Sequence, residues 1–489
     1  MKKFFKIVVS LLVIVAIAYV ATILYFHFSY PQTRWDWSKI DTNDISFPKD
    51  FYWGTATAAH QIEGNNENTN WGEWEKDSSR IKDASNAKIA VDGWKRFRED
   101  VKLMKDLGVN SYRFSLAWNK IEPEKGKINE DALKHYDDVI NELKANNIEP
   151  MITLHHFTHP QWFEQLGAFE KEENIHHFVE FSKLVFVRYR DRVNLWVTLN
   201  EPNVFVTAGY FNTVFPPGKS SPKLAAEVLK NMLKAHVEVY KALKSEPSAV
   251  ANGLSRESNN SNIKVQPSAT ADGSDIQIGL ATSIFQFEPA RRWHLGDWAI
   301  ARVSSNTFNE TILEFFRDGR MNFYVPFETN TIYEDANAPQ MLDFIGVNYY
   351  SHYAFRFDFD FKKATQSLPL EGEEMTDMPY TIYTEGIYRA IKETASLKKP
   401  IIITENGISD SKDDRREKYI RQSLYSVSKA IKDGYDIRGY FYWSLMDNFE
   451  WAEGYTQKFG LYEVNLQTNE RKLREGSKAF AEIIKNNSR

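Results

Sequence analysis

The sequence predicts an α/β protein made of a single (β/α)8 TIM barrel with an N-terminal transmembrane helix. Three observations support this prediction. Short apolar stretches rich in Val, Ile, Tyr and Phe alternate with amphipathic helical patterns through most of the 489 residues. Several of these apolar stretches end in a polar side chain, as barrel strands that carry reactive groups do. One long, uncharged apolar segment precedes all of them.

Residues 1–30 are predicted to be a membrane anchor. Residues 7–28 carry no formal charge, and these 22 residues match the thickness of a bilayer. A cleaved signal peptide is the main alternative, but its apolar region is normally shorter and is followed by small residues. Here residues 25–28 are bulky, so an uncleaved anchor is favoured over a signal peptide, and a buried globular helix is favoured least. Three lysines before the segment predict a cytoplasmic N-terminus, with the rest of the chain outside the cytoplasm.

The remainder of the chain divides into a polar tether at residues 31–46 and a barrel at residues 47–489. Residues 245–274, rich in Ser, Asn, Ala, Pro and Gly, are predicted to be a flexible surface insertion before the fifth strand. The predicted strands are residues 51–59, 111–118, 149–156, 195–202, 276–283, 344–350, 400–407 and 437–444, and the helical patterns between them include residues 91–107, 130–146, 174–190, 224–243 and 415–433.

Composition excludes several classes of protein. With 42% hydrophobic and 14% aromatic residues, the chain can fill a large core, which excludes disorder for most of it. The formal net charge is −5 and no stripe of Lys and Arg is present, so nucleic acid is not an expected partner. The absence of cysteine excludes disulfides, thiolate metal sites and a cysteine nucleophile, but it leaves the compartment undecided.

Two glutamates stand at corresponding strand ends, where a (β/α)8 barrel gathers its reactive groups. The fourth predicted strand ends in Asn200 and Glu201, and the seventh ends in Glu405 and Asn406. Cleavage of a glycosidic bond needs one carboxylic acid to protonate the leaving oxygen and one carboxylate to attack or support the sugar carbon. Either glutamate alone fits a structural ion pair equally well. The two together, each beside an asparagine that can bond a sugar hydroxyl, favour a catalytic pair.

Both motifs resemble those of glycoside hydrolase family 1. The hallmarks of that family are Asn-Glu-Pro at the fourth strand and Thr-Glu-Asn-Gly at the seventh, which stand here at residues 200–202 and 404–407. The resemblance begins with FYWGTATAAHQIEG at residues 51–64 and extends to about Arg474. It implies an O-glycosyl hydrolase similar to β-glucosidases, with Glu201 as the general acid/base and Glu405 as the nucleophile. Retention of the β configuration follows from double displacement.

The resemblance also implies supporting residues. Arg113 matches the family arginine near the nucleophile, where a fixed positive charge favours the ionised carboxylate. Asn348 and Tyr350 match positions from which a tyrosine hydroxyl bonds the nucleophile. The family often has Trp after the histidine of the third strand, whereas Phe157 stands here. The positions that match the innermost sugar subsite are Gln61, His156, Asn200, Trp443 as a stacking floor, Glu450, Trp451, and Phe459 beside the exocyclic C6 group.

A neutral O-linked β-glycoside is the expected substrate. Relatives that act on 6-phosphoglycosides typically have a non-acidic residue where Glu450 stands, and relatives that cleave thioglucosides lack the acid that is present here as Glu201. A terminal non-reducing β-D-glucoside is the first choice, and a glycolipid is a further substrate class. A membrane-anchored transglycosylase that passes the sugar to a lipid or sugar acceptor is the alternative. A non-catalytic glycan-binding protein is disfavoured because both glutamates are present. No metal or other cofactor is expected, because the histidines at 155, 156 and 159 lack a plausible ligand set.

Overall fold

A computed structural model describes residues 1–246, 276–360 and 366–487. Within them, eight parallel strands close into a barrel in which each strand is hydrogen-bonded to its two neighbours. Each strand lies inside one of the ranges predicted from the sequence, so the (β/α)8 barrel is confirmed. In chain order they are β1 (Tyr52–Ala56), β2 (Ser111–Ser115), β3 (Glu149–His155), β4 (Leu195–Asn200), β5 (Gln277–Ser283), β9 (Phe344–Asn348), β11 (Ile401–Asn406) and β12 (Ile437–Trp443).

The barrel strands are buried on both faces, as parallel strands between a packed interior and an outer helix layer must be. Every residue of β4, β9 and β11 is buried. Their apolar side chains join those of the helices in one continuous core. Apolar residues therefore fill both alternating faces of each strand, which is why the strands read in the sequence as unbroken apolar runs.

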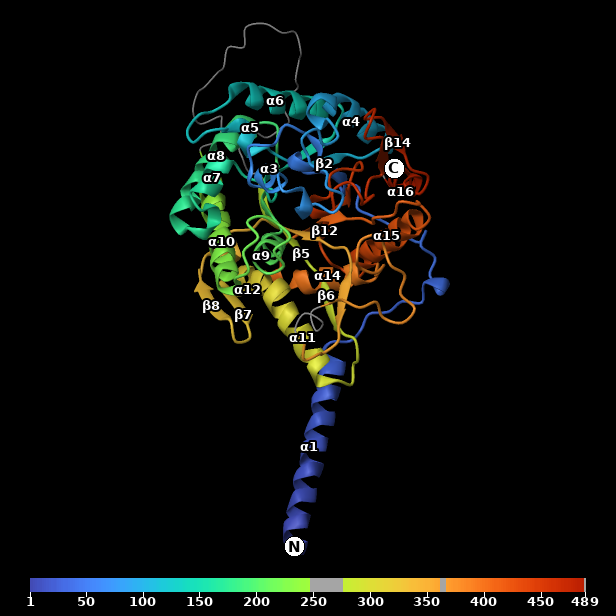
Figure 1. The fold of residues 1–489 in the computed structure, drawn as a ribbon. Helices are drawn as coiled ribbons and strands as arrows, with labels where there is room; N and C mark the ends of the chain where they lie inside the picture. The colour runs from blue at the N-terminus through green and yellow to red at the C-terminus, as the bar shows by residue number, and fades with distance from the viewer. Residues whose placement is uncertain (247–275, 361–365, 488–489) are drawn as a thin grey trace.

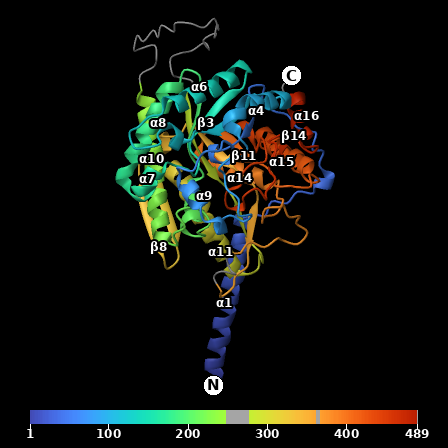
Figure 2. The same ribbon diagram turned by 45° about the horizontal axis from the view of Figure 1, so that its top comes forward.

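Helices surround the barrel (Figures 1 and 2). α4 packs against α6, α8 against α10, α14 against α15, and α16 against both α15 and α4. α6 illustrates why these segments are helical, because its apolar residues recur every three or four positions on the buried face and the Asn129 side chain caps its first turn. The helices of this outer layer include α4 (Gly93–Leu107), α6 (Glu130–Ala145), α8 (Ile175–Tyr189), α10 (Pro222–Ser245), α12 (Thr311–Asp318), α14 (Gly386–Thr394), α15 (Arg416–Lys432) and α16 (Lys478–Asn487).

Among the described residues, three small sheets were not predicted from the sequence, and neither was the helix α11 beside one of them. β6 (Gln286–Pro289) pairs in parallel with β10 (His352–Phe355), and α11 (Leu295–Ser305) follows β6. Because β6 follows β5 and β10 follows β9, this sheet lies beyond the carboxyl ends of the barrel strands, where barrels carry their active sites. The other two sheets are antiparallel pairs: β7 (Arg320–Val325) with β8 (Thr329–Glu334), and β13 (Tyr462–Val464) with β14 (Arg471–Leu473).

The N-terminal segment forms α1 (Lys2–Ser29), a helix that projects away from the barrel beside α11 (Figure 1). None of its residues is buried, and it is long and apolar enough to cross a membrane, a property that it shares with signal sequences. Its last turns contact the barrel. The ring of Phe26 stacks on Trp298 at 5.1 Å, and the Tyr19 hydroxyl donates to the Trp293 carbonyl at 2.6 Å.

The predicted tether runs along the outside of the barrel. The Tyr383 hydroxyl donates to the Thr33 carbonyl at 2.6 Å, the Trp37 indole donates to Glu385 at 3.0 Å, and the Ser46 amide donates to the Ser428 hydroxyl at 2.9 Å. The predicted flexible insertion at residues 245–274 lies outside the described residues except for its first two positions, and α10 extends through the first of these.

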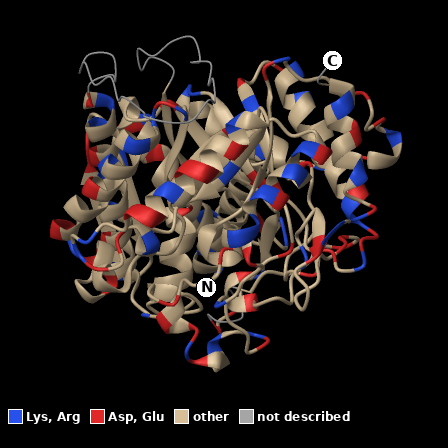
Figure 3. Cartoon of the chain, turned by 90° about the horizontal axis from the view of Figure 1, so that it is seen from above, with Lys and Arg blue, Asp and Glu red and all other residues tan. Residues whose placement is uncertain are grey.

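Charges of both signs are interspersed over the face seen from above in Figure 3. Many of them pair at the surface, for example Arg188 with Asp137 at 2.5 Å. This mixed surface is typical of soluble enzymes that bind neutral ligands, and it differs from the clustered basic surface that nucleic-acid binding needs.

Candidate active site

Glu405 lies in β11 with its carboxylate held on both sides. The Arg113 guanidinium, from β2 across the barrel, donates to Oε1 at 2.6 Å, and the Tyr350 hydroxyl donates to Oε2 at 2.8 Å. Burial raises the pKa of Glu405, and Arg113 and Tyr350 oppose that rise. Both oxygens of this buried carboxyl therefore have partners that favour its ionised form.

Glu201 occupies the turn between β4 and α9 (Pro202–Tyr210). Its backbone is in the left-handed region, with φ 45° and ψ 60°, and its amide donates to the Ala281 carbonyl at 2.8 Å. Pro202 suits the first position of the following helix. Burial first, and then the charge of Glu405, raise the pKa of Glu201 to about 8. The Glu201 carboxyl therefore holds its proton at neutral pH. Glu405, which accepts from the Arg113 guanidinium, is the more readily ionised of the two.

Two asparagines connect the carboxyls. The Asn200 side-chain oxygen accepts from Arg113 at 2.6 Å and from the Asn348 amide at 3.1 Å. The Asn348 side chain also lies near enough to Glu201 and to Glu405 to oppose the rise in the pKa of each. The Thr404 hydroxyl donates to Asn348 at 2.6 Å, which fixes the orientation of its amide. Asn348 thus lies between the two glutamates.

A second group of polar residues surrounds Glu450. The Gln61 side-chain amide, on the short helix α2 (Ala59–Ile62), donates to Asn448 at 3.0 Å, to the Phe449 carbonyl at 2.9 Å and to Glu450 at 3.2 Å. Burial and the charge of Glu405 raise the pKa of Glu450 to about 8, and hydrogen bonds from Trp443 and Gln61 oppose the rise. Glu450 is therefore near enough to Glu405 to sense its charge.

Aromatic rings border these polar groups. His156 lies 5.8 Å from the Trp443 ring and 5.9 Å from the Trp451 ring, nearly parallel to both, and the Asn200 amide is 3.1 Å from its Nε2. Burial lowers the pKa of His156 well below its ordinary value, so the ring is neutral. Phe459 lies 6.0 Å from the Tyr350 ring. The positions named from the sequence thus form one cluster linked by these contacts at the carboxyl end of the barrel.

Comparison with known proteins identifies the family. The family model for glycosyl hydrolase family 1 matches residues 43–489, which is most of the chain. The chain belongs to glycosyl hydrolase family 1. It is an O-glycosyl hydrolase, and its relatives support retaining β-glycosidase activity.

The relatives of this family 1 member cover nearly its whole barrel. Beta-glucosidase A of Acetivibrio thermocellus is 33% identical over 91% of this chain and 99% of its own length. The solved structure of a β-glycosidase from Pyrococcus horikoshii is 36% identical, with a TM-score of 0.76 over 90% of this chain and 95% of that one. The family 1 β-glucosidase of Thermotoga maritima is 29% identical, with a TM-score of 0.78 over 91% of this chain and 99% of that one.

Two residues of the family 1 site were missed in the sequence. Ser283, the last residue of β5, is buried and lies near enough to Glu201 to oppose the rise in the pKa of that carboxyl. The polar-residue-at-strand-end signal that found the glutamates could have found it. Tyr380 lies 6.3 Å from the Tyr350 ring. It follows a long connection with no periodic pattern, so only tertiary packing reveals its place.

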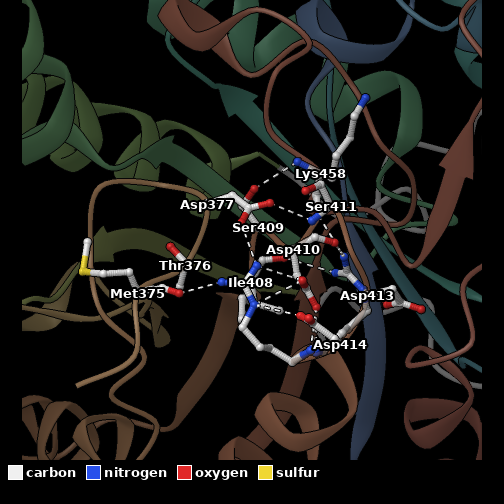
Figure 4. Close-up of polar contacts among 12 residues, drawn as sticks. Met375, Thr376, Asp377, Ile408, Ser409, Asp410, Ser411, Asp413, Asp414 and Lys458 are labelled. Atoms are coloured by element: carbon white, nitrogen blue, oxygen red, sulfur yellow. Dashed lines mark hydrogen bonds and ion pairs between the residues drawn. The ribbon is translucent and has the colours of Figure 1, made fainter. Parts of the chain in front are cut away.

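The connections after β9, β11 and β12 are tied together beside the site. In Figure 4, the Asp377 amide donates to the Ser409 carbonyl at 3.0 Å, and the Ser411 amide donates back to Asp377 at 2.7 Å. The Asp410 amide donates to the Lys458 carbonyl at 3.1 Å. These bonds fix the chain that leads to Phe459.

Arg416 and Arg415 reinforce this network. The fully buried Arg416 guanidinium donates to the carbonyls of Ile408 and Phe459, each at 3.1 Å, and to Asp413 at 2.8 Å. Arg415 donates to Asp377 at 2.6 Å. The buried Arg416 guanidinium thus binds backbone carbonyls on both sides of the network, and these bonds position Phe459 at the aromatic border of the site.

The histidines near β3 do not form a metal site among the described residues. His155 and His159 contact each other at 3.2 Å, and Glu164 bonds His159 at 2.8 Å, a carboxylate that the sequence interpretation overlooked. No group of three potential ligands converges in the part of the chain that the structure describes.

Proposed function

We propose that this chain is a retaining β-glucosidase that hydrolyses terminal non-reducing β-D-glucosides. One observation carries the proposal: the two glutamates are buried together, yet only Glu405 has a guanidinium, at 2.6 Å, while the pKa of Glu201 is raised to about 8. One ionised and one protonated carboxyl are what double displacement needs. The names of the relatives, such as the A. thermocellus β-glucosidase, support the choice of sugar.

In the first step, a Glu405 oxygen attacks the anomeric carbon and forms a glycosyl ester. The bond from that carbon to the glycosidic oxygen breaks, and the Glu201 proton passes to the departing oxygen. Arg113 and Tyr350 keep Glu405 ionised and oriented before the attack. Asn348 lies between the two carboxyls, and the bond that it accepts from Thr404 holds its own side chain in place.

In the second step, Glu201 is the base. It takes a proton from water while the water oxygen attacks the anomeric carbon from the side that the leaving group occupied. The ester bond to Glu405 breaks, and the sugar departs with its original β configuration. Glu201 is again protonated and Glu405 again ionised, so the cycle closes.

The sugar is held by the second polar group. Glu450 accepts hydrogen bonds from hydroxyls of the sugar, and the Gln61 amide donates to them. His156 and Asn200 contact further hydroxyls. Trp443 supplies a platform for the apolar face of the ring, Trp451 borders it, and Phe459 lies beside C6. Glu450 places a partly buried carboxyl where a phosphorylated sugar would need a cation, so a neutral sugar is favoured.

Hydrolysis is proposed rather than transfer to a lipid or sugar acceptor, because relatives such as the 1,4-beta-D-glucan glucohydrolase of Thermotoga neapolitana carry hydrolytic names. α1 is proposed to remain as a single membrane span, with the N-terminus in the cytoplasm and the barrel outside it. None of the residues of the helix is buried, which suits lipid contact.

The stereochemistry of the product tests the proposal. Proton NMR during hydrolysis of an aryl β-D-glucoside should show β-glucose first, with α-glucose appearing only by mutarotation. Initial release of α-glucose would overturn double displacement. Absence of any β-glucosidase activity, with the folded barrel verified by circular dichroism, would overturn the choice of substrate.

A further inference from the structure

A strip of four aromatic side chains covers one face of the β6–β10 sheet. The aromatic strip consists of Phe285, Phe287, Tyr353 and Phe355. Tyr353 lies 4.6 Å from Phe285 and 6.1 Å from Phe287, and Phe287 lies 5.9 Å from Phe355, measured between ring centroids. Residues that alternate along paired strands share a face, so these rings form a continuous surface.

The opposite face of the same sheet is polar and buried. Glu288 is 2% exposed and pairs with Arg389 and Arg292. Phe287 and Tyr353, on the aromatic face, are only partly buried. Phe285 and Phe355, at the two ends of the strip, are 8% and 7% exposed, so the accessible part of the aromatic face is formed by Phe287 and Tyr353. Accessible apolar surface of this kind marks a place where an apolar ligand binds.

The inner end of the aromatic strip reaches the catalytic pair. Phe285 lies 6.5 Å from Tyr380, which lies 6.3 Å from Tyr350, the residue that bonds Glu405. Burial, and after it the charge of Glu201, raise the pKa of Tyr353 to about 12. Glu201 protonates the leaving oxygen in the proposed mechanism, so the group bonded to that oxygen departs past these rings.

The outer end of the strip reaches α1. Beyond β6 the chain leads to Trp293, which is 62% exposed and whose carbonyl accepts from Tyr19 of α1. Beyond β10 it leads to Phe357, which packs against His294 at 5.8 Å, and to Phe359, which is 97% exposed. Figure 1 shows β6, α11 and α1 following one another away from the barrel. Exposed aromatic residues beside an apolar helix are typical of the membrane interface.

We propose that the aromatic strip binds the alkyl chain of a β-glycoside held in a lipid bilayer, with the sugar at the catalytic pair and the chain directed toward α1. This inference rests on the proposed β-glycosidase function and names its aglycone. A four-residue strand such as β6 spans roughly 13 Å, and the partly exposed rings of Phe287 and Tyr353 lie within this length as the apolar contact for an extended chain. Aromatic rings contact methylene groups without requiring a specific shape, which suits lipid tails that differ in length.

Alkyl β-D-glucosides of increasing length, kept below their micellar concentrations, test the surface with the full chain in detergent. Each methylene that the strip buries should raise kcat/KM by up to about fourfold. The informative quantity is the ratio of kcat/KM for octyl over ethyl β-glucoside, because it cancels any general loss of activity. Phe287→Ser should lower this ratio at least fivefold. The matched control is Phe327→Ser, at an exposed phenylalanine in the β7–β8 turn, which should leave the ratio unchanged.

The outcomes separate the two proposals. If the wild-type chain hydrolyses ethyl, octyl and aryl β-glucosides with equal kcat/KM, the aglycone proposal is wrong and the β-glucosidase proposal stands. If it hydrolyses none of them, the β-glucosidase proposal fails first and the aglycone proposal fails with it. An equal fall of the octyl-to-ethyl ratio in both serine variants would also overturn the role of the strip.

The bilayer source is tested with the full chain reconstituted in phosphatidylcholine vesicles that contain a β-glucosyl diacylglycerol. Glucose should be released from the vesicles, and Phe287→Ser should slow that release more than it slows hydrolysis of ethyl β-glucoside. Phe327→Ser should not. Preference for octyl glucoside in solution combined with no release from vesicles would overturn the bilayer as the source of the substrate.

Discussion

Glu201 and Glu405 carry the same functional group in different surroundings. Arg113 is fully buried, and of the two glutamates it hydrogen-bonds only to Glu405. Its other terminal nitrogen donates to the Asn200 side chain. A buried guanidinium favours the ionised form of its partner. A second negative charge nearby would be costly in this interior, so the proton remains on Glu201. Residues from β2 and β4 thus make the two glutamates differ in ionisation, as the proposed mechanism requires.

The pH dependence of kcat/KM should report this division. Activity should fall at low pH as Glu405 becomes protonated, and at high pH, near about 8, as Glu201 loses its proton. With ethyl β-D-glucoside, whose leaving oxygen needs a proton, the wild-type chain should show the alkaline limb in full. Glu201→Gln, assayed with dinitrophenyl β-D-glucoside because that leaving group needs little protonation, should show no alkaline limb, since the amide does not titrate.

Glu450 is the necessary control, because its pKa is also raised to about 8. Glu450→Gln should lower kcat/KM and keep the alkaline limb. Loss of that limb in Glu450→Gln, with its persistence in Glu201→Gln, would assign the limb to sugar binding and contradict the acid/base role.

The sequence allows a site residue to be predicted when that residue stands at the carboxyl end of a barrel strand, because this position faces the mouth of the barrel. Glu201 and Glu405 follow apolar runs, and Ser283 does so as well, although it was not singled out. Tyr380 was not predictable, because it comes from an irregular connection and meets Tyr350 only after the barrel closes. The aromatic strip was not predictable for a different reason. The short strands β6 and β10 alternate polar and aromatic residues, a pattern too brief to distinguish from a loop.

At the scale of elements, the connections after the strands hold the site as firmly as the strands do. Arg416 begins α15 and binds carbonyls from the connections after both β11 and β12. Backbone carbonyls buried in such connections need donors, and one guanidinium satisfies several at once. The position of Phe459 at the aromatic border of the site therefore depends on Arg416, which is not among the proposed sugar-binding residues.

Arg416→Met should lower the free energy of unfolding by roughly 3–5 kcal/mol, because Asp413 and several buried carbonyls lose their partner. It should also raise KM for β-glucosides as the Phe459 segment loosens. Chemical denaturation and steady-state kinetics measure the two effects. Arg421→Met, which removes the partly exposed pairs with Glu417 and Glu482 and a long bond to Asn43, should change stability by at most about 1 kcal/mol. Equal effects of the two variants would contradict the role given to Arg416.

At the scale of the whole molecule, α1 and the catalytic mouth lie at the same end of the barrel. The sheet β6–β10 and α11 extend the carboxyl ends of the strands, and α1 contacts α11 through Phe26 and Trp298. Residues 31–46 then run along the barrel and contact α14 and α15. Contacts on both sides of Tyr30 tie the helix to the catalytic end of the barrel.

The full chain should therefore be found in the membrane fraction and should remain there after an alkaline carbonate wash, because about 22 apolar residues span a bilayer. Intact-mass measurement of the purified protein should show that residues 1–29 are retained. A soluble product that begins after residue 29 would identify the segment as a cleaved signal peptide and contradict the anchor.

The central claim, that Glu405 forms the covalent intermediate and Glu201 assists it, is tested most directly by trapping that intermediate. Glu201→Ala should still react with dinitrophenyl β-D-glucoside, because this leaving group needs little protonation, but the second step then lacks its base. Intact-mass measurement should show one added glucosyl group, and peptide mapping should place it on Glu405. Glu405→Ala should remain unlabelled. A label on any other residue, or rapid release of dinitrophenol without a label, would contradict the account.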